Sequence, residues 1–233
     1  MKTMETTGLR GKDGEYMMSE AESSQEEITA AGNPSQPQGE AGAKMLARMN
    51  ESHAEVTNWA LGFFDWNGTE QVLDIGCGGG AALKRMAEML GPRGRLTGLD
   101  YSEVSVAESR RLNADAVRDG RMKIIAGSVE HLPFADDSFD KITTVESFYF
   151  WPDPQENLRE VRRVLRPGGV FLLVADIHDH EGMSEAAREN IARYHMFNPT
   201  LDGYRELLET AGFRQVRIHT KPGEEWVCAE GRK

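Results

Sequence analysis

The spacing of apolar residues changes near residue 43 and divides the chain into two unlike parts. From there to Phe63, apolar side chains recur at helical spacing, which predicts one or two amphipathic helices. The repeating positions are Met45, Leu46, Met49, His53, Val56, Trp59, Ala60 and Phe63. An Asn67-Gly68 pair then marks a turn. We therefore interpret residues 43–66 as a helical cap and residues 67–233 as the main domain.

Residues 1–42 lack this periodicity and are rich in Glu, Ser, Gly and Gln. The prolines at 34 and 37 interrupt any helix that begins before them. Such a segment buries too little apolar surface to offset the entropy lost on ordering. We predict a flexible tail with a short helix near residues 20–30; a lid over a functional site is the alternative.

Beyond residue 70, short apolar runs alternate with amphipathic stretches. The predicted strands are 71–75, 95–99, 122–126, 139–145, 170–176, 213–220 and 226–230. The predicted helices are 81–90, 104–119, 153–165, 183–195 and 201–211. This alternation predicts an α/β fold with a doubly wound, mainly parallel seven-stranded sheet, closed by an antiparallel C-terminal hairpin. Right-handed crossovers place the loops after the parallel strands on one edge, where ligands bind.

Composition narrows the class of protein. The formal net charge of the 233 residues is -11, which argues against nucleic acid as a partner. The two cysteines form no disulfide framework, no apolar run is long enough to span a membrane, and no secretory signal is recognisable. We expect a cytoplasmic protein; its oligomeric state, dimer included, stays open.

The strongest local signal is the run Val-Leu-Asp-Ile-Gly-Cys-Gly-Gly-Gly at residues 72–80. A strand passes through a glycine-rich turn into a helix, whose N-terminal N–H groups can face a ligand that approaches closely. Gly76, Gly78 and Ala81 also satisfy the looser dinucleotide-binding fingerprint. The turn alone therefore does not identify the ligand.

Two acids refine this interpretation. Asp74 would repel a pyrophosphate but favour the cationic amino acid group of a sulfonium compound; alternatively, it only caps the turn. Asp100 ends the second strand, where an acid binds ribose hydroxyls, a feature that NAD-binding proteins share. Tyr101 is expected either to stack on an adenine or to cover the sheet edge. Ser102 is a natural N-cap.

Residues 71–176, taken in order, resemble the class I S-adenosylmethionine-dependent methyltransferases. Besides the glycine-rich run, the segments 127–134, 137–140 and 160–169 fit this family. The chain is most similar to the small-molecule methyltransferases related to the ubiquinone and menaquinone C-methyltransferases. The resemblance implies methyl transfer from S-adenosylmethionine to a small-molecule acceptor by in-line displacement.

The resemblance also implies roles for individual residues. Asp74, Gly76, Cys77 and Gly78 would surround the methionine group, with Glu146 and Ser147 facing it from beyond the fourth strand. Asp100 would bind the ribose, Tyr101 would lie beside the adenine, and Ser128 and Val129 would contact the adenine edge. The family usually has Asp where Ser128 stands, so weaker cofactor binding is expected.

No catalytic triad is recognisable, and methyl transfer needs a base only when the nucleophile loses a proton. Candidate catalytic groups are His53, Tyr149 and His178; His131, His180 and His195 are further histidines that could act as a base. The run His-Asp-His-Glu at 178–181 is interpreted as a solvated loop rather than a metal site, so no metal is expected. The aromatic run 148–152 either walls a substrate pocket or packs under the next helix.

Two other functions remain open from the residues alone. One is an NAD-type oxidoreductase, and the other is a non-catalytic nucleoside-binding protein on a similar fold.

Overall fold

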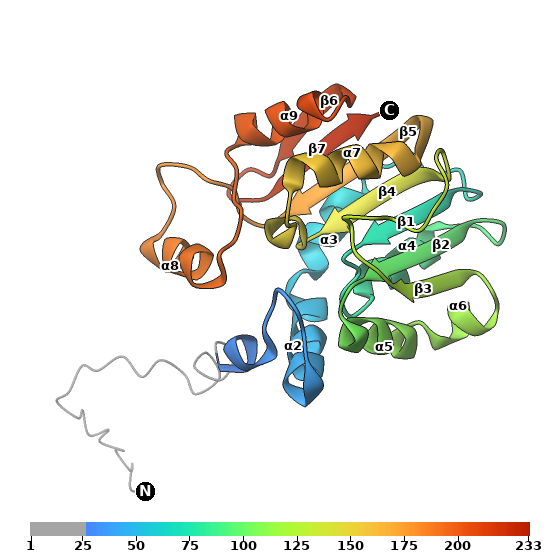
Figure 1. Cartoon of the computed structure of the whole chain (residues 1–233), viewed down its shortest axis with the longest axis horizontal. Helices are drawn as coiled ribbons and strands as arrows, with labels where there is room; N and C mark the ends of the chain where they lie inside the picture. Colours follow the sequence, from blue (N-terminus) through green and yellow to red (C-terminus); the bar gives the residue numbers. More distant parts are fainter. Residues whose placement is uncertain (1–26) are drawn as a thin grey trace, which may run out of the picture.

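The computed structural model describes residues 27–233, and its centre is a seven-stranded sheet in the order β3-β2-β1-β4-β5-β7-β6 (Figure 1). The strands are β1 (Gln71–Ile75), β2 (Arg95–Asp100), β3 (Met122–Ala126), β4 (Phe139–Val145), β5 (Leu165–Ala175), β6 (Arg214–Thr220) and β7 (Val227–Arg232). Strands β1 to β5 pair in parallel, whereas β7 runs antiparallel to β5 and β6. The predicted fold class is confirmed.

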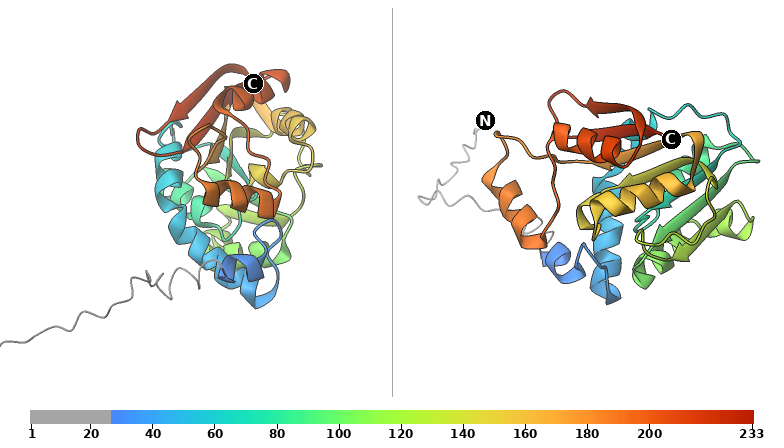
Figure 2. Two further views of the ribbon diagram at one scale, coloured as in Figure 1. Left: turned by 90° about the vertical axis from the view of Figure 1, so that its left-hand side faces the viewer. Right: turned by 45° about the horizontal axis from the view of Figure 1, so that its top comes forward.

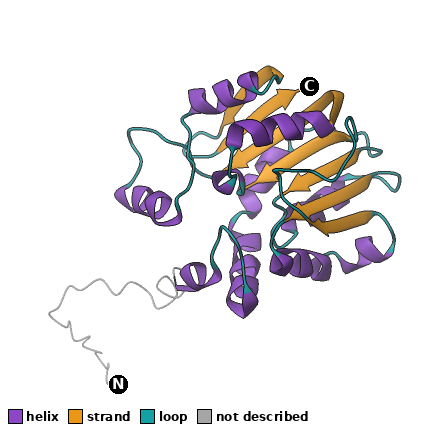
Figure 3. Cartoon of the chain, in the orientation of Figure 1, coloured by secondary structure: helices purple, strands orange, loops and turns teal. Residues whose placement is uncertain are grey.

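Helices cover both faces of the sheet (Figures 2 and 3). They are α2 (Gly39–Ser52), α3 (Ala54–Leu61), α4 (Ala81–Met89), α5 (Glu103–Leu112), α6 (Ala114–Arg118), η1 (Phe148–Phe150), α7 (Pro154–Val164), α8 (Glu185–Tyr194) and α9 (Leu201–Thr210). Along β5, Phe171 and Leu173 pack with α7 and α9, while Leu172 and Val174 belong to the core under α3 and α4. Burial on both faces explains why residues 170–175 of β5 form a continuous apolar run.

Two predicted elements have different bounds in the structure because of contacts with other elements of the fold. The helix predicted over 104–119 is broken at Asn113, whose side-chain amide donates to the carbonyls of Gly80 and Ser109, each at 3.0 Å. A residue that bonds another loop in this way favours a break over a continuous helix. Strand β5 begins at Leu165 rather than 170, because Phe139 pairs with Leu165 before a register shift in the ladder.

The N-terminal boundary also differs from the prediction. Helix α2 begins at Gly39, so the division predicted at residue 42 falls inside a helix. Before it, the carbonyl of Pro37 accepts a hydrogen bond from the Ser102 hydroxyl at 2.6 Å, which ties this segment to the start of α5. The predicted tail over residues 1–26 lies outside the described residues.

Strand order places the ligand-binding edge. The chain winds from β1 outward to β3 and then returns to β4 beside β1, so the crevice at their carboxyl ends is a topological switch point. Helix α2 lies across this edge (Figure 1). Helix α8 stands away from the sheet and has no buried residue (Figure 2). In the part of the chain from residue 27 on, no helix has the length and apolarity that crossing a membrane requires.

Candidate active site

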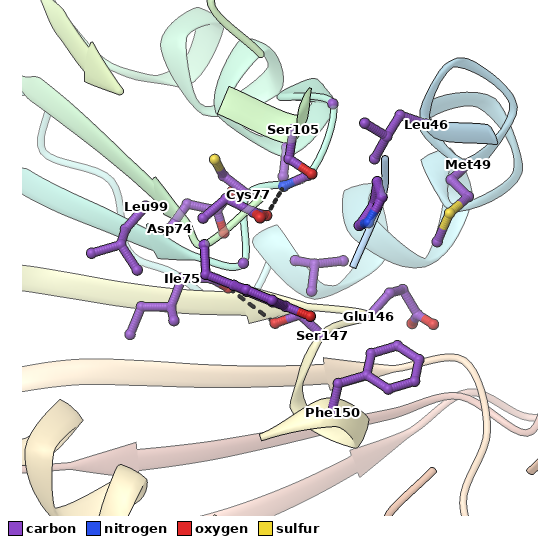
Figure 4. Close-up of a pocket in the computed structure, with 18 of the residues that line it drawn as sticks. Leu46, Met49, Asp74, Ile75, Cys77, Leu99, Ser105, Glu146, Ser147 and Phe150 are labelled. Atoms are coloured by element: carbon purple, nitrogen blue, oxygen red, sulfur yellow. Dashed lines mark hydrogen bonds between the residues drawn. The ribbon is translucent and has the colours of Figure 1, made fainter. Parts of the chain in front are cut away.

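A cavity of about 280 Å³ opens at the carboxyl ends of β1, β2 and β4, beneath α2. This volume is near the lower end of the range typical of small-molecule sites. Figure 4 shows Leu46 and Met49 of α2 on one side, Asp74 and Cys77 opposite them, and Glu146 and Phe150 along a third side. The cavity therefore brings together the glycine-rich turn, the end of β4 and the helical cap.

The glycine-rich turn is held by the end of β2. The N–H groups of Gly76 and Cys77 both donate to the Leu99 carbonyl, at 2.8 and 3.1 Å. The N–H of Gly78 donates to the Asp100 carboxylate at 2.9 Å. Gly76 has a φ of +70°, and a Cβ there would lie 2.3 Å from the Ser147 hydroxyl. Glycine is therefore required at position 76 both by backbone conformation and by the close approach of β4.

Asp74 lies at the cavity with only 1% of its surface exposed, and neither carboxylate oxygen has a hydrogen-bond partner among residues 27–233. It does not cap the turn, because the turn's N–H groups bond Leu99 and Asp100 instead. Burial, and then the charge of Asp100, raises the pKa of Asp74 well above its usual range. A buried carboxyl without a partner suits a cationic ligand group.

Asp100 has a double role. One oxygen accepts from Gly78 and the other accepts from the Ser102 N–H at 2.9 Å, and its carboxyl lies at the cavity wall. Burial raises the pKa of Asp100. Each oxygen keeps a further lone pair for a ligand hydroxyl. The neighbouring Tyr101 is 47% exposed and also lines the cavity, so its ring is accessible.

The predicted adenine-edge residues, Ser128 and Val129, follow the end of β3. The Ser128 hydroxyl donates to the Glu130 carboxylate at 2.9 Å and accepts from the Glu130 N–H at 3.2 Å. Val129 is buried, and both residues line the cavity. Because its proton already bonds Glu130, the Ser128 hydroxyl offers a new ligand only its acceptor capacity.

Cys77 and Ser147 line the cavity but also have partners in the protein. The Cys77 thiol is buried 3.9 Å from the Ser109 hydroxyl, and burial raises its pKa well above the usual range. The Ser147 hydroxyl donates to the Ile75 carbonyl at 3.1 Å and lies 2.6 Å from that of Thr144. Ser147, which follows β4, is therefore hydrogen-bonded to the last residue of β1.

Four ionisable side chains converge beyond the end of β4: His53, Glu146, Tyr149 and Asp176. The Tyr149 hydroxyl lies 3.0 Å from Glu146 Oε2 and 3.1 Å from Asp176 Oδ1, and it accepts from the Asp176 N–H at 3.2 Å. Burial, and then the charge of Asp176, raises the pKa of Glu146 well above its usual range. Burial lowers the pKa of His53, which favours the neutral imidazole.

The same cluster contains a possible metal-ligand set. One ligand atom each from His53, Glu146 and Asp176 lies within 4.8 Å of the others. His53 and Glu146 also line the cavity. Glu146 has a φ of +54°, a left-handed conformation that is uncommon for a residue with a side chain and recurs at functional sites.

His178 lies apart from the other two catalytic candidates. Its Nδ1 is 2.8 Å from the Glu225 carbonyl, and His180 Nε2 is 2.9 Å from the Glu225 carboxylate. Neither histidine lines the cavity. The aromatic run combines both predicted roles: Phe148, Tyr149 and Trp151 are buried in the core, and Phe150 and Trp151 also line the cavity.

Several cavity residues come from the N-terminal part of the chain, where the sequence left a lid over the site as the alternative to a flexible tail but indicated no individual residue before His53. The Asn50 amide donates to the Gly79 carbonyl at 3.3 Å, and Pro34 and Pro37 lie at the cavity. Nothing in the composition of residues 27–38 indicates this, because the contacts are made by backbone and small side chains. The helical periodicity that contains Met49 was the one available signal.

Known proteins that resemble this chain in sequence and in structure are methyltransferases. Residues 73–173 match a family model described as a methyltransferase domain. The chain is 32% identical over 198 residues to the 27-O-demethylrifamycin SV methyltransferase of Amycolatopsis mediterranei, which covers 80% of this chain and 70% of that protein. It is 41% identical over 100 residues to the demethylmenaquinone methyltransferase of Listeria monocytogenes, covering 42% of this chain and 41% of that protein.

Among solved structures, a SAM-dependent methyltransferase from Aquifex aeolicus superposes with a TM-score of 0.67 at 19% identity, covering 81% of this chain and 97% of that chain. This likeness concerns the fold. The chain spans 42–62% of the length of several other curated methyltransferases that it matches.

Proposed function

From the premise that this chain belongs to the S-adenosylmethionine-dependent methyltransferases, we propose that it transfers a methyl group from that cofactor to a small-molecule acceptor. The cofactor supplies an activated methyl group on a sulfonium. The protein's part is to align the acceptor with that methyl group and to exclude water. The helix α2, which contributes Leu46, Met49 and Asn50 to the cavity wall, supports a role of the protein in shielding the site from water.

The observation that carries the proposal is the partnerless carboxyl of Asp74 beside the turn. It fits the ammonium group of the cofactor's methionine end, which would donate the missing hydrogen bonds. A pyrophosphate has no hydrogen-bond donors to offer the two partnerless oxygens of Asp74, which argues against an NAD-type oxidoreductase. The residues present therefore fit S-adenosylmethionine.

The residues that line the cavity support the remaining cofactor contacts that we propose. We assign the ribose to the free lone pairs of Asp100, the adenine to the space between Tyr101 and Val129, and the methionine to the turn at Gly76–Gly78. The activated methyl group would then point toward Glu146, His53 and Phe150. That end is where we place the acceptor.

Calorimetry tests this function against its two alternatives. S-adenosylmethionine and S-adenosylhomocysteine are expected to bind, and NAD is not. Binding of NAD alone would contradict the proposal. A metabolite extract is then added with S-adenosylmethionine: formation of S-adenosylhomocysteine supports an enzyme, whereas binding without turnover would favour a non-catalytic nucleoside-binding protein.

A cytoplasmic location is part of the same proposal, supported by two buried cysteines that form no disulfide. The net charge of -11 supports a small molecule rather than nucleic acid as the partner.

A further inference from the structure

Arg85 of α4 is the one lysine or arginine in the described chain that lines the cavity. Its side chain is half-buried, and within residues 27–233 its guanidinium takes part in no hydrogen bond or ion pair. Aspartate and glutamate, by contrast, account for four lining residues: Asp74, Asp100, Glu130 and Glu146. Arg85 is therefore a cation that the protein presents to the cavity and leaves without a partner of its own.

The position of Arg85 on α4 directs it toward the glycine-rich turn. Helix α4 begins at Ala81, immediately after the turn, and Ala81, Ala82 and Arg85 all line the cavity. Residues i and i+4 share one face of a helix and side chains lean toward its N-terminus, so the guanidinium extends toward the start of α4. Leu83 and Met86 of the same helix are fully buried, which holds this orientation. Arg85 thus lies beside the part of the cavity to which we assign the methionine group.

We infer that Arg85 binds the carboxylate of the cofactor's methionine group and makes the site selective for a cofactor that carries this carboxylate. This inference rests on the proposed function. The methionine group has an ammonium and a carboxylate, and Asp74 is the proposed partner of the ammonium alone. One acid before the turn and one cation after it therefore match the two opposite charges of a single ligand group.

The surroundings make a cationic partner necessary for that carboxylate. On binding, the carboxylate leaves water and enters a cavity with four acids on its wall. Both the lost hydration and the charge of each ionised acid oppose its binding. A guanidinium offsets these costs, because it attracts the carboxylate and can donate two parallel hydrogen bonds to its oxygens.

The same chemistry defines the ligand that the site rejects. A decarboxylated cofactor keeps the ammonium for Asp74 but has no anion for Arg85, and its net charge is one unit more positive. The cavity is therefore expected to bind it more weakly. An acidic group on the methyl acceptor is the other anion that could reach Arg85. An experiment without any acceptor separates these two sources.

Calorimetry with S-adenosylhomocysteine and with its decarboxylated analogue tests this selectivity. The wild-type protein should bind S-adenosylhomocysteine about 10-fold more tightly than the analogue, and Arg85→Met should remove most of this difference by weakening only the carboxylated ligand. Arg85→Lys should recover part of the loss, because it keeps the charge but not the forked donors. Lys84→Met, at the exposed neighbouring position of α4, should leave both affinities unchanged.

The possible results separate the role of Arg85 from the proposed function. An Arg85→Met protein that binds S-adenosylhomocysteine as tightly as wild type would overturn the inference and assign Arg85 to the acceptor instead. Equal losses of affinity for the two ligands would also contradict it, since that pattern indicates a structural role. In both cases the wild type still binds the cofactor product, so the proposed function stands. A wild type that binds neither ligand would refute the proposed function, and the role of Arg85 with it.

Discussion

The N–H of Gly78 donates to the carboxylate of Asp100 at 2.9 Å, so the acid that ends β2 also holds the turn that follows β1. One side chain thus links two parts of the proposed cofactor site, the methionine turn and the ribose end. A substitution at this position is expected to affect both the binding of the cofactor and the order of the turn.

Asp100→Ala should weaken S-adenosylmethionine binding by about 1–3 kcal/mol, because the ribose loses its acceptor and the Gly78 N–H loses its partner. Asp100→Asn keeps one acceptor oxygen and should lose less. Calorimetry measures both variants. Unchanged affinity in a folded Asp100→Ala protein would refute the ribose assignment.

Gly76→Ala should lower the free energy of unfolding by about 2 kcal/mol or more, because it combines a left-handed φ with a clash against Ser147. Gly120 is a matched control: its φ is +69°, but a Cβ there would meet nothing within 4 Å. Gly120→Ala should therefore cost only about 1 kcal/mol. Equal losses for the two variants in denaturant unfolding would show that the approach of Ser147 is not limiting.

The raised pKa of Asp74 makes the ligand-free protein less stable as pH rises. From about pH 4 upward, the unfolded chain releases this proton while the folded protein still holds it, so the free energy of unfolding falls until pH passes the folded pKa. Asp74→Asn should reduce this pH dependence and raise stability at pH 7 by about 1 kcal/mol or more.

The same Asp74→Asn variant should bind S-adenosylmethionine more weakly, since an amide does not compensate an ammonium charge. Thermal unfolding across pH and calorimetry are the two measurements. A variant that is less stable than wild type and binds equally well would contradict the role given to Asp74.

Ser102→Ala removes two interactions, the N-cap of α5 and the bond to the Pro37 carbonyl. Ser184 caps α8 in the same way and, within residues 27–233, has no such second bond. Each loss of a cap should cost about 1 kcal/mol. Only Ser102→Ala should also speed hydrogen exchange in residues 33–38; exchange unchanged there would show that the Pro37 contact does not order this segment.

The sequence predicted the bounds of helices and strands best where those bounds depend on neighbouring residues in the chain. Strands β1, β3 and β4 have their predicted bounds, because each is a short segment with buried apolar residues that lies between turns or helices. The break at Asn113 was not predictable, since it depends on the carbonyl of Gly80 across a helix–helix contact. The ordered contacts of residues 33–38 involve backbone atoms, which leave no apolar pattern.

Part of the candidate site could be predicted, because that part consists of motifs that are local in the sequence. The glycine-rich turn and Asp100 are sequence motifs, and the structure brings them together. The pairing of Glu146 with Asp176 joins the ends of two strands through Tyr149, and no spacing along the chain indicates it. His178 followed a strand as expected, but its ring bonds the loop before β7 instead of facing the cavity.

A crystal structure of the protein with S-adenosylhomocysteine is the most direct test. The account predicts the ligand's ammonium group within hydrogen-bond distance of Asp74, its ribose hydroxyls on Asp100, and its sulfur directed toward Glu146. A ligand bound elsewhere, or a cavity that stays without it at saturating concentration, would contradict the account.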